Sequence, residues 1–235
     1  MASILKVSNL SVIFPDQDVL TDISFEVQEG ESLAIVGPNG SGKSVLLRAL
    51  IGAVPYIGLV TWGNGVRIGY VPQRLDLDRS IPLTLGDFLA TKIKILGLPK
   101  NVAQEALLKV KLDASFLDKK LGFLSGGQFQ RALIAFALIG KPNVLLFDEP
   151  TSGVDLPREE QIYETLHRLE DEGGLTLILV SHDLSLVYKH SSQVICLNKS
   201  LICEGVPQEV LTSETLQKLY GDRVLYHHEH DDRSL

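Results

Sequence analysis

The sequence predicts a mixed α/β fold, in which a parallel-sheet core carries an antiparallel β subdomain and is interrupted by an inserted α-helical subdomain. Three short, unbroken apolar runs are typical of central parallel strands buried on both faces, and they occupy residues 33–36, 144–147 and 175–180. Alternating apolar and polar residues at 23–27 and 66–71 predict antiparallel strands with one wet face. A hydroxyl residue followed by an acid three positions later, Thr84 and Asp87, predicts the start of the helical insertion.

Composition and charge limit the possible partners. The chain has 235 residues, of which 45% are hydrophobic and 22% charged, as in an ordinary globular domain. Its formal net charge of -7 argues against nucleic acid, whose phosphate backbone attracts basic surfaces. The N-terminus runs into a strand pattern without the features of a signal peptide, and no apolar run approaches about 20 residues. We therefore expect a soluble, cytoplasmic protein that reaches a membrane only through a partner.

One domain is expected over residues 1–235. Residues about 1–83 and 141–220 would form the α/β catalytic core with its β subdomain, and about 84–140 the helical subdomain, with a second helix opening at Asn101. One more helix is expected near 206–220, before a polar tail at 221–235. Cys196 and Cys203 flank a predicted hairpin turn and could face each other, but two cysteines in a chain of this length are interpreted as buried, reduced thiols.

The strongest local motif is a glycine-rich loop at residues 37–44, which we call the phosphate loop. It matches G-x-x-x-x-G-K-[ST], follows a predicted strand and precedes an apolar helical stretch. Its backbone amides and the helix N-terminus favour phosphate, Lys43 is expected to reach the β and γ phosphates of a nucleoside triphosphate, and Ser44 to bind Mg²⁺. The predicted phosphate-binding residues are Gly37, Pro38, Asn39, Gly40, Ser41, Gly42, Lys43 and Ser44.

Two further motifs follow along the chain. The apolar run at 144–147 delivers Asp148 to a strand end, where it can hold Mg²⁺, and the next carboxylate, Glu149, is placed to polarise a water. Residues 124–128, which we call the signature loop, read Leu-Ser-Gly-Gly-Gln and form a second small-residue nest before a helix. Because one phosphate-binding element already serves the chain's own nucleotide, the second is explained most simply by a nucleotide held in another subunit.

The order of these three motifs resembles the ATP-binding cassette (ABC) family, and the resemblance covers nearly the whole chain. It implies a P-loop NTPase (RecA-like) core, ATP and Mg²⁺ as ligands, and a homodimer that encloses two ATP molecules. Each site would combine one chain's phosphate loop with the signature loop of the other chain. That loop would contribute Ser125, Gly126, Gly127 and Gln128.

The resemblance also implies roles for single residues. Phe14 occupies the position of an aromatic residue that stacks on adenine, usually a tyrosine, and a core phenylalanine is the alternative. Glu149, His182 and Gln73 are the implied catalytic residues, with His182 contacting the γ-phosphate, while Ser44, Gln73 and Asp148 are the implied Mg²⁺ ligands. The loop that ends at Asp155 is expected to cross the dimer interface. Phe136 departs from the family, which commonly has arginine there.

Two functions remain open at this stage: the ATPase subunit of a membrane transporter, or a soluble ABC ATPase acting in repair or cofactor assembly. The single cassette, the lack of long heptad runs and the acidic charge favour the transporter. Its partners would be a separate membrane permease and an extracytoplasmic substrate-binding protein, with this subunit peripheral to the inner membrane. Residues 70–74 and 81–87 are similar to cassettes of zinc, manganese and iron importers. His227, His228 and His230 could bind a divalent metal or belong to a solvated tail.

Overall fold

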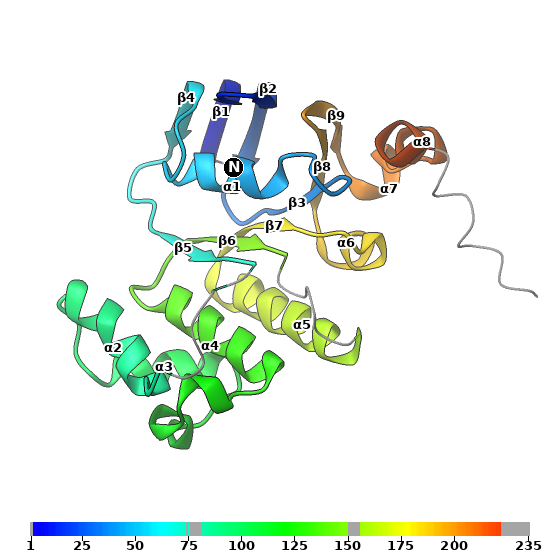
Figure 1. Cartoon of the computed structure of the whole chain (residues 1–235). Helices are drawn as coiled ribbons and strands as arrows, with labels where there is room; N and C mark the ends of the chain where they lie inside the picture. The colour runs from blue at the N-terminus through cyan, green and yellow to red at the C-terminus, as the bar shows by residue number, and fades with distance from the viewer. Residues whose placement is uncertain (1, 74, 76–80, 150–155, 222–235) are drawn as a thin grey trace, which may run out of the picture.

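The computed structural model describes residues 2–73, 75, 81–149 and 156–221. An antiparallel sheet lies at the top of Figure 1, a six-stranded sheet crosses the middle, and helices α2, α3, α4 and α5 lie below it. The phosphate loop and the end of β6 meet at the middle layer, so this sheet positions the predicted site. Asp155, the rest of its loop and the histidines of the C-terminal tail lie outside the described residues.

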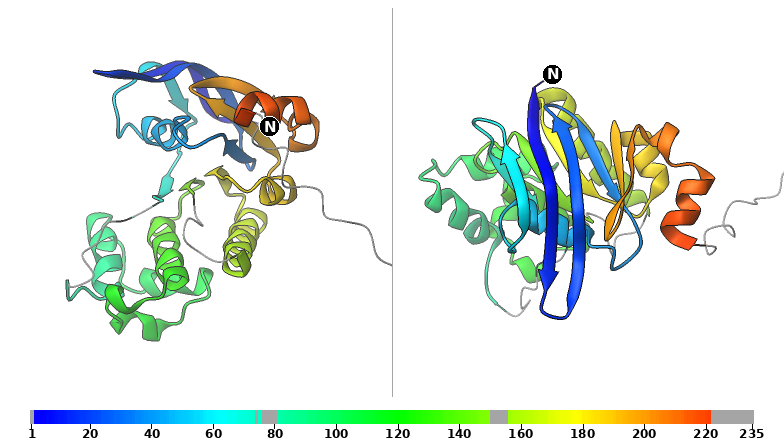
Figure 2. Two further views of the ribbon diagram at one scale, coloured as in Figure 1. Left: turned by 45° about the vertical axis from the view of Figure 1, so that its right-hand side comes forward. Right: turned by 90° about the horizontal axis from the view of Figure 1, so that it is seen from above.

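The antiparallel sheet has the strand order β2-β1-β4. Strand β1 spans Ser3–Phe14, β2 spans Gln17–Gln28 and β4 spans Ile57–Trp62. Figure 2 shows β1 and β2 running side by side across the molecule when it is seen from above. Residues of β2 alternate between buried and exposed, so the prediction of a strand with one wet face is confirmed at residues 23–27.

The central sheet has the order β5-β6-β7-β3-β8-β9. Strands β3 (Ser32–Val36), β6 (Val144–Asp148) and β7 (Thr176–Val180) are parallel and buried at every position, which confirms the three predicted core strands. The prediction of an antiparallel strand at 66–71 is wrong. Strand β5 (Ile68–Val71) pairs in parallel with β6 at the sheet edge, where its alternating burial reflects partial cover rather than antiparallel pairing.

The helices predicted between residues 84 and 140 are present. Helix α2 spans Leu85–Ile95, α3 Val102–Lys109 and α4 Gly126–Leu138, and two short 3-10 turns at Ala114–Asp118 and Leu121–Phe123 separate α3 from α4. Thr84 and Asp87 form a reciprocal capping box at the start of α2. Asn101 also precedes a helix, but its side chain makes no cap and instead donates to Glu105 at 2.7 Å.

The remaining helices pack on the other parts of the sheet. Helix α1 spans Lys43–Leu50, α5 Leu156–Gly173 and α6 Leu184–His190. The single helix predicted near 206–220 is two helices, α7 (Pro207–Val210) and α8 (Ser213–Tyr220). They divide where Thr212 leaves the helical conformation and caps α8, its hydroxyl accepting from the Thr215 amide.

Two apolar clusters hold the layers together, one on each face of the central sheet. Along β6, Leu145 and Phe147 belong to the cluster shared with the lower helices, whereas Val144 and Leu146 belong to the cluster shared with α1 and the antiparallel sheet. This alternation fixes β6 between two layers, because successive side chains of a strand point to opposite faces. The strand is therefore packed against apolar side chains on both of its faces.

The cysteine interpretation needs a correction. Strands β8 (Gln193–Asn198) and β9 (Ser200–Gly205) form an antiparallel hairpin, in which Cys196 and Cys203 lie directly opposite each other, as the turn prediction allowed. They are joined by a disulfide with 4.8 Å between their Cα atoms, so the reading of two reduced thiols is wrong. Direct opposition across two strands brings the Cβ atoms into the range that a disulfide requires, which the spacing alone did not reveal.

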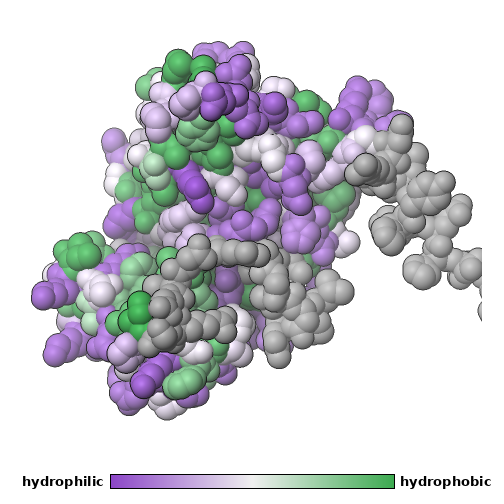
Figure 3. Space-filling view, in the orientation of Figure 1, coloured by the Kyte–Doolittle hydropathy of each residue, from purple (hydrophilic) through white to green (hydrophobic). Residues whose placement is uncertain are grey.

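In the described part of the chain, no helix combines the length and apolar character needed to cross a membrane. The surface in Figure 3 mixes polar and apolar residues over the face that it shows. Several large apolar side chains are nevertheless well exposed, including Ile57 and Leu59 on β4 and Ile95 and Phe123 in the helical part.

Candidate nucleotide-binding site

The phosphate loop joins β3 to α1, and two of its glycines are required by close packing. A Cβ at Gly37, where φ is 156°, would lie 2.0 Å from the carbonyl oxygen of Leu197. A Cβ at Gly42, where φ is 99°, would lie 2.6 Å from a methyl group of Leu20. Gly42 is also the N-cap of α1, so the helix begins at Lys43 and directs its N-terminus toward the loop. The loop conformation is therefore accessible only with glycine at these positions.

Lys43 is almost fully buried inside the loop. Its Nζ atom donates to the carbonyl oxygens of Gly37 at 2.8 Å and Pro38 at 3.0 Å, and it lies 3.9 Å from a carboxylate oxygen of Glu149. Burial lowers the pKa of Lys43, while the negative charges of Glu149 and Asp148 act in the opposite direction. Among the described residues, this desolvated ammonium group is held by two carbonyl oxygens and one carboxylate, which phosphate oxygens can replace.

Two acids at the end of β6 face the same loop. Asp148 is buried, and its carboxylate accepts hydrogen bonds from the Ser44 hydroxyl at 2.7 Å and from the Tyr70 hydroxyl at 3.3 Å. Glu149 follows with a φ of 46°, a left-handed conformation that is uncommon for a residue with a side chain. Its carboxylate accepts a hydrogen bond from the side-chain amide of Gln73. Because the backbone turns at Glu149, the two successive carboxylates have different partners: Asp148 accepts from Ser44 and Tyr70, and Glu149 accepts from Gln73.

These groups surround one cavity of about 530 Å³, a volume within the usual range for small-molecule sites. The structure brings together the predicted residues Asn39–Ser44, Gln73 and Glu149 around it. Gln17 and Val19 of β2 also line the cavity and were not predicted, because an exposed or half-buried strand residue carries no local signal of a binding role. Pro38 and Asp148 lie just behind the cavity wall. The Pro38 carbonyl oxygen accepts a hydrogen bond from Lys43, and the Asp148 carboxylate accepts one from Ser44.

Phe14 and His182 lie at the edge of this arrangement. Phe14 ends β1 opposite Gln17 and is 38% exposed, which excludes the core phenylalanine that was the alternative. His182 follows β7 and is exposed. Neither side chain lines the cavity as the described residues form it. Their proposed contacts with adenine and the γ-phosphate therefore stay predictions.

The signature loop lies at a different place, on the helical part. Ser125 caps α4 through a reciprocal pair of hydrogen bonds with Gln128, at 3.1 and 3.3 Å. A second cavity of about 260 Å³ lies here, lined by Ser125, Gly127, Gln128 and two cations, Lys111 and Arg131. It shares no lining residue with the first cavity. One chain thus presents two separate polar hollows.

Comparison with known proteins places this arrangement in a family. Residues 20–152 match the family model described as ABC transporter. The chain belongs to the ABC transporter family. This ABC chain is 43% identical to the zinc import ATP-binding protein ZnuC of Jannaschia sp. (strain CCS1), over 93% of its own length and 89% of that protein. The resemblance inferred from the three motifs is confirmed.

Solved structures of other ABC proteins share the fold. One, described as a metal-chelate type ABC transporter in an inward-facing conformation, superposes with a TM-score of 0.84 at 27% identity, over 93% of this chain and 89% of the other. Another is a dimeric ATP-binding cassette in a post-hydrolysis state with bound ADP and Pi, with a TM-score of 0.73 at 26% identity over 86% and 98% of the two chains. The predicted mixed α/β cassette fold is confirmed.

Two tyrosines of this ABC chain were missed as parts of the site. Tyr70 lies within the motif that contains Gln73, and its hydroxyl reaches Asp148; burial and the Asp148 charge raise its pKa. Tyr220, at the end of α8, has a buried hydroxyl beside the Gly37 amide, at a geometry short of a full hydrogen bond. Burial raises the pKa of Tyr220 and the Gly37 amide opposes this rise. No local motif marks Tyr220, because its contact depends on how α8 packs.

The departure from the ABC pattern at Phe136 has a structural explanation. The Phe136 ring stacks on Phe88 with 4.5 Å between the ring centroids. The Lys92 ammonium lies 5.1 Å from the Phe136 centroid and donates to the carbonyl oxygens of Phe136 and Ala137, at 2.9 and 3.0 Å. Lys92 thus supplies a cation at the C-terminal end of α4, where it is favourable, from a neighbouring helix. An arginine at position 136 would place a second positive charge next to the Lys92 ammonium group.

Proposed function

We propose that this chain is the ATP-hydrolysing subunit of a zinc importer and that it works as a homodimer attached to a separate membrane permease. The observation that carries the proposal is the convergence of Lys43, Ser44, Gln73 and Glu149 on one cavity, with Asp148 bound to Ser44 just behind its wall. The chain also matches a zinc import ATP-binding protein over 93% of its length. The convergence supports nucleotide chemistry, and the relative supports zinc as the transported ion.

ATP binding would use groups that are already in place. The loop from Gly37 to Gly42 can turn its amides toward phosphate, and the N-terminus of α1 adds favourable partial charge. Lys43 would leave the carbonyl oxygens of Gly37 and Pro38 and donate to the β and γ phosphates. Phe14, exposed at the end of β1, would supply an aromatic face to adenine.

The residues at the phosphate end suit Mg²⁺. The Ser44 hydroxyl and the Asp148 carboxylate are hydrogen-bonded to each other at 2.7 Å, and Gln73 offers an amide oxygen at the same cavity. Oxygen donors with a single carboxylate match the way Mg²⁺ is held jointly by a protein and nucleotide phosphates. When bound, the ion would neutralise charge on the β and γ phosphates. Ser44, Asp148 and Gln73 would hold it.

Hydrolysis is assigned to Glu149. Its carboxylate lies on the cavity wall and is oriented by the side-chain amide of Gln73. In this role Glu149 accepts a proton from the water that attacks the γ-phosphate, and the left-handed backbone at this residue separates its carboxylate from that of Asp148. Lys43 stabilises charge on the transferred phosphoryl group, and His182 would contact the same group from the end of β7.

The two separate cavities support a dimer. The signature loop lines a hollow apart from the phosphate loop through Ser125 and Gly127, so it is available to a nucleotide held by another chain. A second copy would place it against the γ-phosphate, with Gln128 and Asp155 near the interface. The structural relative solved as a dimer with ADP and Pi supports this assembly. Loss of the γ-phosphate would then loosen the interface.

The transport role comes from the relatives. The permease would span the membrane, an extracytoplasmic substrate-binding protein would deliver the ion, and this subunit would act on the cytoplasmic side of the inner membrane. Zinc is chosen over manganese and iron because the curated relative is a zinc import protein.

A Glu149→Gln variant tests the ATPase assignment. It should bind ATP with unchanged affinity, lose turnover by about 10²- to 10⁴-fold because the proton acceptor is gone, and accumulate as an ATP-bound dimer. Phosphate release and light scattering after gel filtration measure both effects. The exposed Glu29→Gln is the matched control and should behave as wild type, whereas Lys43→Ala should lose nucleotide affinity itself. A fully active, monomeric Glu149→Gln protein would refute the mechanism.

Zinc is tested in vesicles that contain the permease and this subunit. ATP should drive uptake of Zn²⁺, and the Lys43→Ala subunit should abolish it. Uptake of Mn²⁺ or Fe²⁺ in place of Zn²⁺ would overturn the choice of ion and leave the ATPase assignment intact.

A further inference from the structure

The disulfide lies directly behind the phosphate loop. Cys196 on β8 pairs with Cys203 on β9 on one side and with Val36 on β3 on the other. Val36 is the last residue before Gly37, where the loop begins. Both cysteines and Val36 belong to one apolar cluster, which also receives Tyr220. The sulfur bridge is therefore one strand away from the start of the nucleotide site.

The β8–β9 hairpin also contacts the phosphate loop through its backbone. The Leu197 carbonyl oxygen, one residue after Cys196, lies so close to Gly37 that no side chain fits between them. At the turn, the Lys199 amide donates to the Ser41 carbonyl oxygen at 3.0 Å. The Lys199 carbonyl oxygen in turn accepts from the Thr21 amide of β2 at 2.8 Å. The hairpin thus contacts the loop at its first residue, Gly37, and again at Ser41.

The register of this hairpin changes at the disulfide. Ile195 pairs with Glu204 and Cys196 with Cys203, but Leu197 pairs with Leu201, so β9 has one extra residue between the two pairs. A bulge of this kind allows a strand to shift its pairing, and a shift by one residue reverses which face each side chain occupies. The covalent bond fixes the pairing on the side of the bulge that leads away from the phosphate loop.

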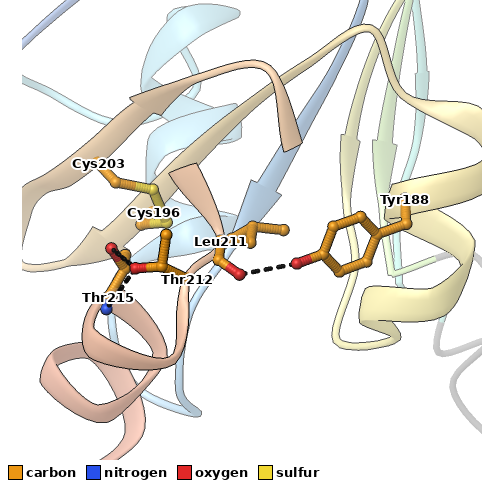
Figure 4. Close-up of a disulfide and its surroundings, with 6 residues drawn as sticks. All are labelled: Tyr188, Cys196, Cys203, Leu211, Thr212 and Thr215. Atoms are coloured by element: carbon orange, nitrogen blue, oxygen red, sulfur yellow. Dashed lines mark hydrogen bonds between the residues drawn. A yellow bond between two sulfur atoms is a disulfide. The ribbon is translucent and has the colours of Figure 1, made fainter. Parts of the chain in front are cut away.

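The two sulfur atoms differ in access. Cys196 is fully buried, whereas Cys203 is half-buried on the outer strand of the sheet. Figure 4 shows the bridge between the two strands near the start of α8, where Leu211 accepts a hydrogen bond from the Tyr188 hydroxyl at 2.7 Å. A reagent would reach the bond at Cys203. Disulfides in reducing compartments are commonly transient or redox-sensing, which fits a subunit that acts on the cytoplasmic side.

We propose that Cys196 and Cys203 form a reversible disulfide that sets the affinity of the phosphate loop for ATP; the inference rests on the proposed nucleotide-binding function. When the bond is present, the hairpin holds Gly37 and Ser41 in the binding conformation. When it is reduced, the hairpin can shift at its bulge, the Lys199 contact with Ser41 weakens, and ATP binds less tightly.

The reductant is a dithiol. Its thiolate attacks the Cys203 sulfur and forms a mixed disulfide, while the bond to Cys196 breaks and the Cys196 sulfur leaves with the electron pair and takes up a proton. The second thiol of the reagent then displaces the Cys203 sulfur, which is also protonated. Two electrons pass from the dithiol, which ends as a cyclic disulfide, to the two protein thiols.

The test compares the full chain in its two redox states. Purified protein is oxidised with diamide or reduced with dithiothreitol, the thiol count is fixed by alkylation and mass spectrometry, and the affinity for a fluorescent ATP analogue is titrated. The reduced protein should bind about three- to tenfold more weakly, as expected for the loss of about one backbone hydrogen bond. Cys203→Ser is the matched variant: it should bind like reduced wild type and should not respond to either reagent.

The outcomes separate the switch from the proposed function. Equal affinities in the two verified redox states of wild type, two free thiols after oxidation, or a redox response that persists in Cys203→Ser would each overturn the switch. Absence of ATP binding in both states would refute the nucleotide-binding function and the switch together. If Cys203→Ser does not fold, as judged by circular dichroism, the two states of wild type decide the matter alone.

Discussion

Three glycines of the two loops have different structural reasons to be glycine, and alanine at each should reveal them. A Cβ at Gly37 would lie 2.0 Å from the Leu197 carbonyl oxygen, whereas Cβ contacts closer than 3.0 Å are essentially never seen, so one of the two strands must move by about 1 Å. At Gly40, with φ at 80°, a Cβ meets nothing within 4 Å. At Gly126, in the first turn of α4, a Cβ also meets nothing and φ is not positive.

These geometries predict three different changes in the free energy of unfolding when each glycine is replaced by alanine. Gly37→Ala combines overpacking, about 1–3 kcal/mol, with a strained backbone of similar cost, so we expect a loss of roughly 2–6 kcal/mol. Gly40→Ala keeps only the left-handed penalty, about 1–2 kcal/mol. Gly126→Ala should be neutral or gain up to about 1 kcal/mol, since alanine is the better helix residue.

Urea unfolding followed by circular dichroism measures all three. Affinity for a fluorescent ATP analogue should fall in Gly37→Ala and stay unchanged in Gly126→Ala, whose residue lies outside the first cavity. ATP hydrolysis should nevertheless drop at least about tenfold in Gly126→Ala if the signature loop meets the nucleotide of a second chain. The steric reasoning fails if Gly37→Ala is as stable as Gly40→Ala. The dimer reasoning fails if Gly126→Ala hydrolyses ATP at the wild-type rate.

Three other predictions concern single side chains. Tyr70→Phe removes the hydroxyl that reaches Asp148 and should cost about 1–2 kcal/mol in urea unfolding; no change would exclude that hydrogen bond. Phe136→Arg should cost about 1–3 kcal/mol because it places a second positive charge beside the half-buried Lys92. Adding Lys92→Met should restore part of the loss, and an unchanged urea midpoint would contradict this. Burial lowers the pKa of Lys43 below its usual 10.5, and phosphate favours the charged form of this side chain. The affinity for ATP should therefore fall as the pH rises through the lowered pKa, and Lys43→Arg should lose this pH dependence. A wild-type affinity that stays constant up to pH 10.5 would contradict the prediction.

Much of the site could be predicted because its chemistry is encoded locally. The phosphate loop follows a strand whose five residues are all buried and precedes a helix, and each of these features has a short-range pattern. The same holds for Asp148 and Glu149, which end another buried strand, and for the Thr84 cap. Glycines, caps and apolar runs act within a few residues, so the sequence displays them directly.

Other features depend on which distant segments pair. Residues 68–71 alternate like an antiparallel strand, yet β5 runs parallel to β6. Val144, the partner of Ile68, lies 76 positions further along the chain, so no local pattern shows the direction of pairing. Gln17 and Val19 line the cavity only because the antiparallel sheet packs above α1. The contact of Tyr220 with the loop likewise requires α8 to fold back over the hairpin.

By itself, the sequence predicted a loop suited to a triphosphate, two acids at a buried strand end and a second small-residue loop interpreted as serving a partner's nucleotide. The tertiary structure decided which groups meet: Ser44 with Asp148, Gln73 with Glu149, and Cys196 with Cys203. The physical reason is the distance along the chain between the residues that interact. Backbone conformation and burial period are set by neighbouring residues, whereas strand order and side-chain contacts arise from the packing of segments that are far apart in the chain.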